Sequence, residues 1–303
     1  MSRSHTQLFV SIRALCAGVC AACAATGPAD GQIAAEAITL QTAEGVARGW
    51  VAEVDLTHPA VSVEALVVPT GSEGVVELIT PDAWFSDDES LRLVVNANYF
   101  GTRGDGTAKI VGMCVAARES ISRERVFDGV PDPAIVITQD GFASAAPSGA
   151  GMHAMRTDGD KARAARSAFA GVGGSTSSDV KGTLLVASGL NTGETARVQP
   201  MVRHPRTALG VSEDGRTLIV AVIDGRQDGW SVGLTLPELA GVMLRRGAWD
   251  AVNLDGGGSS AFLWRDGDAI RGNRPSDGGY RPVAVSLGVR VEEGVSASQA
   301  DGE

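Results

Sequence analysis

Residues 207–260 read TALGVSEDGRTLIVAVIDGRQDGWSVGLTLPELAGVMLRRGAWDAVNLDGGGSS and contain the clearest structural pattern in the 303-residue chain. Two runs of apolar and β-branched residues, 207–211 and 218–223, are separated by the turn-forming residues 213–216. Short apolar runs that flank an Asp-Gly turn are typical of a β-hairpin. The sequence therefore predicts two antiparallel strands here, the second of which ends at Asp224.

A helix and a third strand are predicted after the hairpin. Thr235 and Glu238 form a capping box, which marks the start of a helix, and Gly247 is typical of a helix end. The apolar residues between them recur at helical spacing and share one face. They are Leu236, Leu239, Ala240, Met243 and Leu244. Residues 251–254 then predict a strand that ends at Asp255.

The rest of the chain is predicted to be rich in short strands. The clearest are at 37–40, 50–56, 61–67, 91–96, 261–264 and 282–291. Residues 101–112 and 138–182 lack periodicity and are interpreted as loops, with a weak helix over Lys161–Phe169. We therefore expect an α+β fold: a single domain with a strand-rich mixed or antiparallel sheet and a few flanking helices.

Composition and charge limit the class of protein and of partner. The chain is 44% hydrophobic, which is too apolar for a disordered protein. Its formal net charge of −10 argues against a nucleic acid or an anionic membrane surface as a partner. An acidic protein that handles an anionic substrate needs its arginines gathered at the site. We expect no cofactor and no metal, and no pattern specifies an oligomeric state.

Residues 1–24 are predicted to be a signal peptide, which makes the protein exported, either periplasmic or secreted. Arg3 and Arg13 are followed by the small, apolar stretch Ala14–Ala25, which is too short for a permanent membrane anchor. A lipoprotein signal with Cys23 as the lipidated residue is less favoured, because the residue three positions earlier does not fit that signal. Loss of this segment removes three of the four cysteines, so no internal disulfide is expected.

Asp255 opens the strongest candidate site. It ends a predicted strand and is followed by Gly256, Gly257, Gly258 and Ser259. Backbone amides left uncovered by glycines can form an anion-binding nest, to which Ser259 could add a hydroxyl donor. The segment is not a nucleotide-binding P-loop, because no Gly-Lys-Ser/Thr follows. The alternative interpretation is a tight loop capped by Asp255.

A second strand ends similarly, in Asp224-Gly225-Arg226. If the two strands lie side by side, Asp224 and Asp255 converge on one rim, although an isolated Asp-Gly is usually a turn. Arg206 opens the first strand of the hairpin, so Arg206 and Arg226 are expected to be neighbours. A pair of guanidinium groups suits phosphate recognition, and solvated surface arginines are the alternative.

Further polar residues lie in segments that border the predicted strands. Asn96 ends a buried strand and can hydrogen-bond a sugar hydroxyl, and Tyr99 can face a sugar ring. Asn273 and Arg281 lie in the polar loop that enters the last strand. His204 could serve as an acid or a base, but a lone histidine beside proline is more often structural. Packing at a strand end is the alternative for Asn96 and Tyr99.

Taken together, these motifs resemble the phosphodiester glycosidase family. They occur in one order along the chain: NANYF at 96–100, RTALG at 206–210, DGR at 224–226, GLTL at 233–236, NLDGGGS at 253–259 and the polar loop at 273–282. The resemblance implies an α+β catalytic domain that hydrolyses sugar-1-phosphodiesters. It divides the chain into a strand-rich N-terminal part at 25–89, a phosphodiester glycosidase domain at 90–291 and a disordered tail at 292–303. His204 matches no motif of the family.

The reaction implied by the resemblance agrees with the residue types. The group that leaves C1 of a sugar-1-phosphodiester is a phosphomonoester, whose second pKa is about 6, so it departs without a strong general acid. Ordinary glycosidases need two carboxylates because an alkoxide leaves poorly. We therefore expect one essential carboxylate, with arginines and backbone amides that neutralise the developing phosphate charge.

The resemblance and this chemistry together assign roles as hypotheses. Asp255 is the catalytic carboxylate, as nucleophile or as base for water, and Asp224 is a second acid or the structural partner of an arginine. The groups expected to hold phosphate are Arg206, Arg226, Arg281, Gly256, Gly257, Gly258 and Ser259. Asn96 and Asn273 are expected to hold the sugar.

Two other function classes stay open for a glycan or sugar-phosphate ligand. A metal-dependent phosphodiesterase or phosphatase would use Asp224 and Asp255 as ligands and cleave the P–O bond. The presence of only four histidines argues against it. A non-catalytic envelope module that binds anionic glycans is the second alternative. The sequence specifies neither the sugar nor the group beyond the phosphate.

Overall fold

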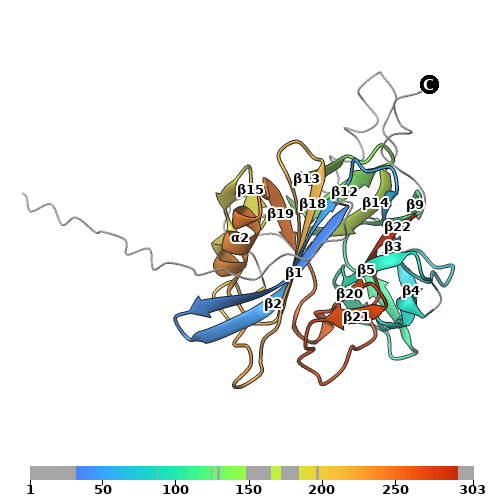
Figure 1. Ribbon diagram of the computed structural model, residues 1–303. Helices are drawn as coiled ribbons and strands as arrows, with labels where there is room; N and C mark the ends of the chain where they lie inside the picture. Colours follow the sequence, from blue (N-terminus) through green and yellow to red (C-terminus); the bar gives the residue numbers. More distant parts are fainter. Residues whose placement is uncertain are drawn as a thin grey trace, which may run out of the picture.

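The computed structural model describes most of the chain between Gln32 and Glu292 (Figure 1). The described residues are 32–86, 88–123, 125–127, 130–147, 165–171, 184–195 and 198–292. The predicted signal peptide lies outside them, as does all but the first residue of the predicted tail. Within this part of the chain, no helix has the length and apolar character needed to cross a membrane.

The largest sheet has seven strands, and all of its neighbouring strands are antiparallel. In order across the sheet they are β1 (Ile33–Thr42), β2 (Gly45–Asp55), β18 (Thr217–Ile223), β17 (Arg206–Val211), β19 (Asp250–Asn253), β15 (Val186–Ala187) and β16 (Leu190–Asn191). β17 and β18 form the predicted hairpin, with Arg206 opposite Ile223. The N-terminal hairpin β1–β2 extends the same sheet through β18.

Four smaller sheets complete the described structure. Two of them have five strands each. The strand order of the first is β21 (Ala269–Gly272), β20 (Phe262–Asp266), β5 (Leu91–Asn96), β22 (Ser286–Val291) and β3 (Val61–Leu66). The strand order of the second is β13 (Ala143–Pro147), β12 (Pro133–Thr138), β14 (Ala165–Ala170), β8 (Cys114–Ala116) and β9 (Glu119–Ser122). The others are β4 (Val75–Glu77), β7 (Thr107–Ile110), β6 (Phe100–Thr102) and the pair β10 (Val126–Phe127), β11 (Val130–Pro131).

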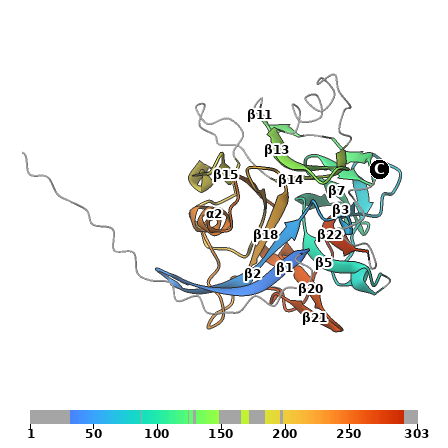
Figure 2. The same ribbon diagram turned by 45° about the horizontal axis from the view of Figure 1, so that its top comes forward.

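The single α-helix of the described residues, α2 (Leu236–Arg245), covers one face of the seven-stranded sheet (Figures 1 and 2). The predicted capping box is present, since the Thr235 hydroxyl accepts from the Glu238 amide and the Glu238 carboxylate accepts from the Thr235 amide. The predicted apolar face is largely buried, including Leu239 and Met243. It packs against sheet residues such as Ile219, so burial fixes the helix on this face.

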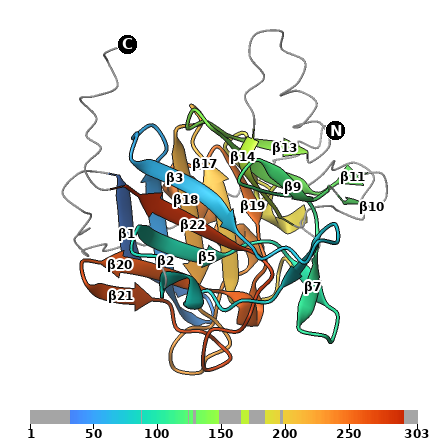
Figure 3. The same ribbon diagram turned by 90° about the vertical axis from the view of Figure 1, so that its right-hand side faces the viewer.

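The opposite face of this sheet packs against the two five-stranded sheets (Figure 3). Because side chains alternate along a strand, β18 sends Ile219 toward the helix and Leu218 and Val220 toward the other sheets. Trp50 of β2 stacks on Phe262 of β20, with ring centroids 5.4 Å apart. The main core therefore lies between sheets rather than between sheet and helix.

The predicted strand-rich, antiparallel architecture with few flanking helices is confirmed, but the fold is largely β rather than α+β, since the described residues contain one α-helix. Residues 165–170, most of which fall within the predicted weak helix, form β14, and parts of the predicted loop at 101–112 form β6 and β7. β14 pairs with β12 and β8 on its two sides, and Ala168 and Phe169 are fully buried. These long-range contacts override the local preference of an alanine-rich segment for helix.

Candidate active site

Three neighbouring inner strands of the seven-stranded sheet bring several of the predicted site residues together where the strands begin or end. β17 lies between β18 and β19 and is antiparallel to both, so its first residue, Arg206, lies where β18 and β19 end. The segments at these strand ends line an open cavity of ≈ 460 Å³. Its described lining residues are Tyr99, Val198, Gln199, His204, Pro205, Arg206, Arg226, Asp255, Gly256, Gly257, Gly258 and Arg281. The structure thus brings Asp255 together with all three predicted arginines.

Asp255 supplies the one carboxylate among the described lining residues. Its backbone amide donates to the Ala97 carbonyl at 3.0 Å, and its Oδ1 accepts from the Gly256 amide at 3.0 Å. Burial raises the pKa of Asp255, while a hydrogen bond from Ser259 and the charge of Arg281 act in the opposite direction. A carboxylate with a raised pKa is a better base when ionised.

The glycine loop is a tight turn rather than an open nest of amides. Residues Gly257–Ser259 form a short 3-10 turn, in which the Ser259 amide donates to the Gly256 carbonyl at 3.1 Å. The Gly257 amide donates to the Pro205 carbonyl at 2.9 Å. These two amides therefore already have acceptors inside the protein, which argues against their predicted role as phosphate donors. Gly257 has a φ of 60°, in the left-handed region that glycine adopts most readily.

Arg206 places a buried positive charge beside the cavity. Its side chain is almost fully buried and donates to four backbone carbonyls. These belong to Val198, Gln199, Val202 and Leu234, at 2.8–3.2 Å. Burial lowers the pKa of Arg206 to about 10, so it stays charged near neutral pH. Among the described residues no carboxylate forms an ion pair with it, and a buried charge without a counter-charge attracts an anion.

Arg226 and Arg281 are the more accessible arginines of the cavity. Arg226 donates through Nε and Nη2 to Nδ1 of His204, at 3.3 and 3.2 Å, and its Nη1 packs against Gly257. Arg281 donates through Nε and Nη2 to Oγ of Ser259, at 3.1 and 2.6 Å. Each guanidinium is therefore held along one edge by a neutral acceptor, while Nη1 of Arg281 lies 3.8 Å from the half-exposed carboxylate of Asp277.

Three cavity residues, His204, Gln199 and Tyr99, were predicted weakly or not at all. His204 contacts Gln199 through Nε2 at 2.6 Å, and the pKa of His204 is lowered by burial and by the charges of Arg206 and Arg226. Gln199 lies in a segment without regular periodicity, so no sequence pattern indicated it. Tyr99 accepts from Nδ2 of Asn253 at 2.8 Å, and burial raises the pKa of Tyr99.

Asp224 lies outside the cavity lining and ties two loops together. It is 3% exposed, and its carboxylate accepts from Trp230 Nε1 at 2.9 Å, Asn273 Nδ2 at 3.0 Å and the Arg274 amide at 3.1 Å. Burial raises the pKa of Asp224 above its ordinary value, and these hydrogen bonds offset only part of that rise. The predicted convergence of the two aspartates in one site is therefore absent, because β17 separates them and the carboxylate of Asp224 is used inside the fold.

Asp224→Asn is expected to reduce the free energy of unfolding by about 2 kcal/mol, because one acceptor oxygen becomes an amide that faces buried donors. Urea denaturation measures the change, with the exposed Asp228→Asn of the same loop as the matched control. We expect kcat per folded molecule to change less than tenfold. A hundredfold loss of kcat at unchanged stability would instead assign Asp224 to the chemistry.

The two asparagines predicted to hold sugar are buried hydrogen-bonding residues. Asn96 is 0% exposed; its Nδ2 donates to the Asp255 carbonyl at 2.6 Å, and its Oδ1 accepts from Thr207 at 2.8 Å and from the Ala261 amide at 3.0 Å. Asn273 is 7% exposed and bonds inside the fold as well. Their burial argues against direct contact with a substrate. Asn96 instead fixes the backbone of Asp255.

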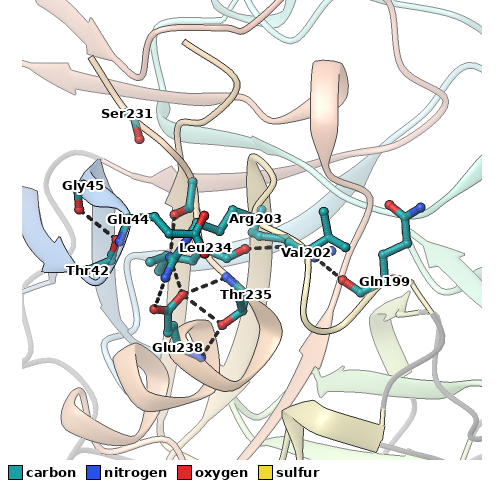
Figure 4. A network of polar contacts seen from close by, with 12 residues as sticks. Thr42, Glu44, Gly45, Gln199, Val202, Arg203, Ser231, Leu234, Thr235 and Glu238 are labelled. Carbon is teal, nitrogen blue, oxygen red and sulfur yellow. Dashed lines mark hydrogen bonds and ion pairs between the residues drawn. The ribbon is translucent and has the colours of Figure 1, made fainter. Parts of the chain in front are cut away.

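A polar network fixes the segment that precedes β17 (Figure 4). Arg203 forms a bidentate ion pair with Glu238, at 2.5 and 2.7 Å, and lies 3.3 Å from Glu44 of the β1–β2 turn. Glu238 also caps α2 through Thr235. The neighbouring Val202 carbonyl accepts from the buried guanidinium of Arg206. These contacts connect α2, the β1–β2 hairpin and the segment before β17, and they fix one wall of the cavity.

The arrangement combines one carboxylate with three positive charges, as an anionic substrate requires. Positive side chains can neutralise a phosphate group, and a carboxylate can take a proton or attack a carbon atom. In the described part of the chain, no three His, Cys, Asp or Glu side chains gather closely enough to hold a metal ion. The carboxylate and the three arginines together suit acid–base or nucleophilic chemistry beside an anionic group.

Solved structures share this fold. The catalytic domain of zebrafish N-acetylglucosamine-1-phosphodiester alpha-N-acetylglucosaminidase, auto-inhibited by its pro-peptide, superposes with a TM-score of 0.60 at 19% identity, over 89% of this chain and 86% of that one. A Burkholderia pseudomallei protein, described as a candidate exported protein, gives a TM-score of 0.53 at 20% identity, over 81% and 74% of the two chains. A protein from Synechocystis gives 0.51 at 16% identity, over 86% and 62%.

Sequence comparisons connect the cavity to a family. The prophage-derived protein YomE of Bacillus subtilis is 39% identical over 89 residues, which is 28% of this chain and 13% of that much longer protein. The family model described as phosphodiester glycosidase matches residues 91–290, well over half of the chain. That range includes every described residue that lines the cavity. This chain therefore belongs to the phosphodiester glycosidase family.

Proposed function

We propose that this protein hydrolyses sugar-1-phosphodiesters, of the N-acetylglucosamine-1-phosphodiester type, at the glycosidic C1–O bond, releasing a free sugar and a phosphomonoester. The observation that carries the proposal is the half-buried carboxylate of Asp255, the one acidic side chain among the described cavity-lining residues, which shares this cavity with Arg206, Arg226 and Arg281. Family membership supports a hydrolase of this kind. The zebrafish protein of the same fold is named for this type of substrate.

The proposed reaction requires little from a general acid. Arg226 and Arg281 bind the phosphate from the accessible side of the cavity, and Arg206 adds its buried charge. When the C1–O bond breaks, its electron pair passes to the phosphate oxygen, where the arginines stabilise the added charge. Asp255 either removes a proton from the water that bonds to C1, or bonds to C1 first and is then released by water.

Three residues have positioning roles in this proposal: Asn96 and Asn273, which were expected to hold the sugar, and Asp224, which was expected to be a second acid or the structural partner of an arginine. Asp224 and Asn273 connect the loops that carry Arg226 and Arg281, and Asn96 holds the backbone of Asp255. We also propose that the protein is exported, on the basis of the signal pattern in residues 1–24. Export would give it access to sugar phosphodiesters of envelope polymers.

The acidic limb of the pH profile is expected to report Asp255. Burial raises its pKa above the ordinary 3.8, so kcat/KM should fall as the pH drops through a midpoint above 3.8 and the carboxylate becomes protonated. Arg281→Gln should move this midpoint upward, because the positive charge of Arg281 favours the ionised carboxylate. If Asp255 acted as a general acid, activity would instead fall as the pH rises through its pKa.

The direct test is product analysis with UDP-N-acetylglucosamine and with a chromogenic N-acetylglucosamine phosphodiester. Free sugar and phosphomonoester are quantified with and without a chelator. The proposal predicts free sugar in amounts unaffected by the chelator. Sugar 1-phosphate formed only with metal would favour a metallo-phosphoesterase. Tight binding of these diesters without turnover would favour a glycan-binding module.

A further inference from the structure

Arg226 has an uncommon backbone conformation, and its guanidinium is bonded to a neutral side chain, that of His204. Its backbone has a φ of 57°, in the left-handed region that residues other than glycine rarely adopt. The preceding Gly225 packs so closely on Pro205 that a methyl group there would lie 2.6 Å from the Pro205 nitrogen. The backbone is thus fixed at the base of this side chain, while the guanidinium is fixed at its tip by His204.

These contacts specify the protonation state of His204. A guanidinium can only donate hydrogen bonds, so Nδ1 of His204 must present its lone pair to Arg226. The proton of the neutral ring therefore lies on Nε2, which is 2.6 Å from Oε1 of Gln199 and donates to it. Gln199 selects the tautomer that Arg226 needs, in the way that a second partner orients a catalytic histidine.

We propose that His204 is a positioning residue for anion binding: its neutral imidazole, oriented by Gln199, aims Arg226 at the phosphate, and protonation of His204 releases that arginine. The relation parallels that of Arg281 and Ser259, where a hydroxyl holds the same edge of a guanidinium. For Arg226, Nη1 takes no part in the contact with His204 and is then the nitrogen that meets the anion. Identifying this anion as a substrate phosphate rests on the proposed function, whereas the anion site itself does not.

The surroundings of His204 keep it neutral near neutral pH. The charged and titratable groups that line its cavity are Arg206 of β17, Arg226 after β18, Asp255 after β19, Tyr99 after β5 and Arg281 before β22. Burial, Arg206 and Arg226 each disfavour a second positive charge and lower the pKa of His204 below the ordinary 6.5. Loss of the Arg226 contact is therefore expected only in acidic solution, below pH 6.5.

The first experiment is a double-mutant cycle on the affinity for sulfate, an anion whose charge is constant over the pH range used. His204→Ala and Arg226→Gln are each expected to weaken sulfate binding about tenfold, since both remove the oriented guanidinium. The double variant should bind no more weakly than Arg226→Gln, because His204 acts through Arg226. Additive losses would overturn the proposal. His58→Asn, at a histidine outside the cavity lining, is the control and should bind as wild type.

The second experiment separates a positioning histidine from one that binds the anion itself. His204→Asn keeps an acceptor near the position of Nδ1 but does not titrate, so it should bind sulfate within about threefold of wild type at neutral pH. As the pH falls through the pKa of His204, the wild type should lose affinity relative to His204→Asn. This comparison removes the contribution of Asp255, which titrates in both proteins. A relative gain of wild-type affinity at acidic pH would show direct binding by the imidazolium and overturn the proposal.

Failure of this inference is distinguishable from failure of the proposed function. Sulfate binding needs no turnover, so a non-additive cycle in a protein without diester hydrolysis retains the role of His204 and rejects the reaction. If the protein hydrolyses diesters but the two substitutions have additive effects, the role of His204 is rejected and the proposed function is retained. In an active enzyme the loss in His204→Ala should appear mainly in KM, and His204→Asn should restore it.

Discussion

Asp255→Asn is expected to lower kcat by about 10³-fold or more, because the amide can neither bond to C1 nor accept a proton from water. The fold should persist, since the amide oxygen can still accept from the Gly256 amide. Removing the negative charge from a cavity that binds anions should also tighten sulfate binding. The variant is therefore predicted to bind better and react far more slowly, which initial rates and an equilibrium titration measure separately.

The matched control for this variant is Asp277→Asn. Asp277 lies 3.8 Å from Arg281 and is about half exposed, so it is a second carboxylate beside the same arginine. Its replacement should change kcat by no more than a few fold. Wild-type turnover by Asp255→Asn would remove Asp255 from the chemistry. Equal losses in both variants would show that the charge near Arg281 matters and that the identity of the carboxylate does not.

Arg206→Met is expected to reduce both stability and anion affinity. Four carbonyl oxygens would lose a charged donor inside the protein, which should lower the free energy of unfolding by about 3 kcal/mol. The cavity would also lose its buried positive charge, so sulfate affinity should fall at least tenfold. Arg206→Lys keeps the charge but lacks the planar fork, so it should recover much of the affinity and little of the stability.

Arg265→Met is the matched control for this second prediction. Arg265 also donates to backbone carbonyls, those of Leu91 and Phe85, but it lies outside the cavity lining. Its loss should lower stability without changing sulfate affinity. Denaturant titration and sulfate titration of the folded proteins separate the two effects. Unchanged affinity in Arg206→Met would show that the buried charge plays no part in anion binding.

Local patterns predicted the elements that are specified by neighbouring residues. The capping box of Thr235 and Glu238 and the hairpin around the Asp214-Gly215 turn depend on contacts within a few residues, and both are present. β14 could not be predicted in this way, because its strand conformation depends on pairing with two strands elsewhere in the chain. The fold class was therefore only partly predicted.

The same distinction applies to the candidate site. The sequence could predict that Arg206, Arg226 and Asp255 lie close together. In an antiparallel sheet the first residue of one strand lies beside the last residues of its neighbours, and Arg206 begins β17 while Arg226 and Asp255 follow β18 and β19. The direction of the Asp224 carboxylate could not, since it depends on Asn273, which is 49 residues further along the chain. The amides of the glycine loop were likewise assigned to phosphate, although one of them bonds to the carbonyl of Pro205, which only the folded chain brings near.

The bond that is broken tests the central claim most directly. Hydrolysis of an N-acetylglucosamine phosphodiester in water enriched in oxygen-18 places the label in whichever product receives the water oxygen. Attack at C1 predicts label in the hydroxyl of the released sugar and none in the phosphomonoester, both read by mass spectrometry. Label in the phosphate would mean cleavage of the P–O bond, and it would contradict the assignment of Asp255 and the three arginines to a glycosidase reaction.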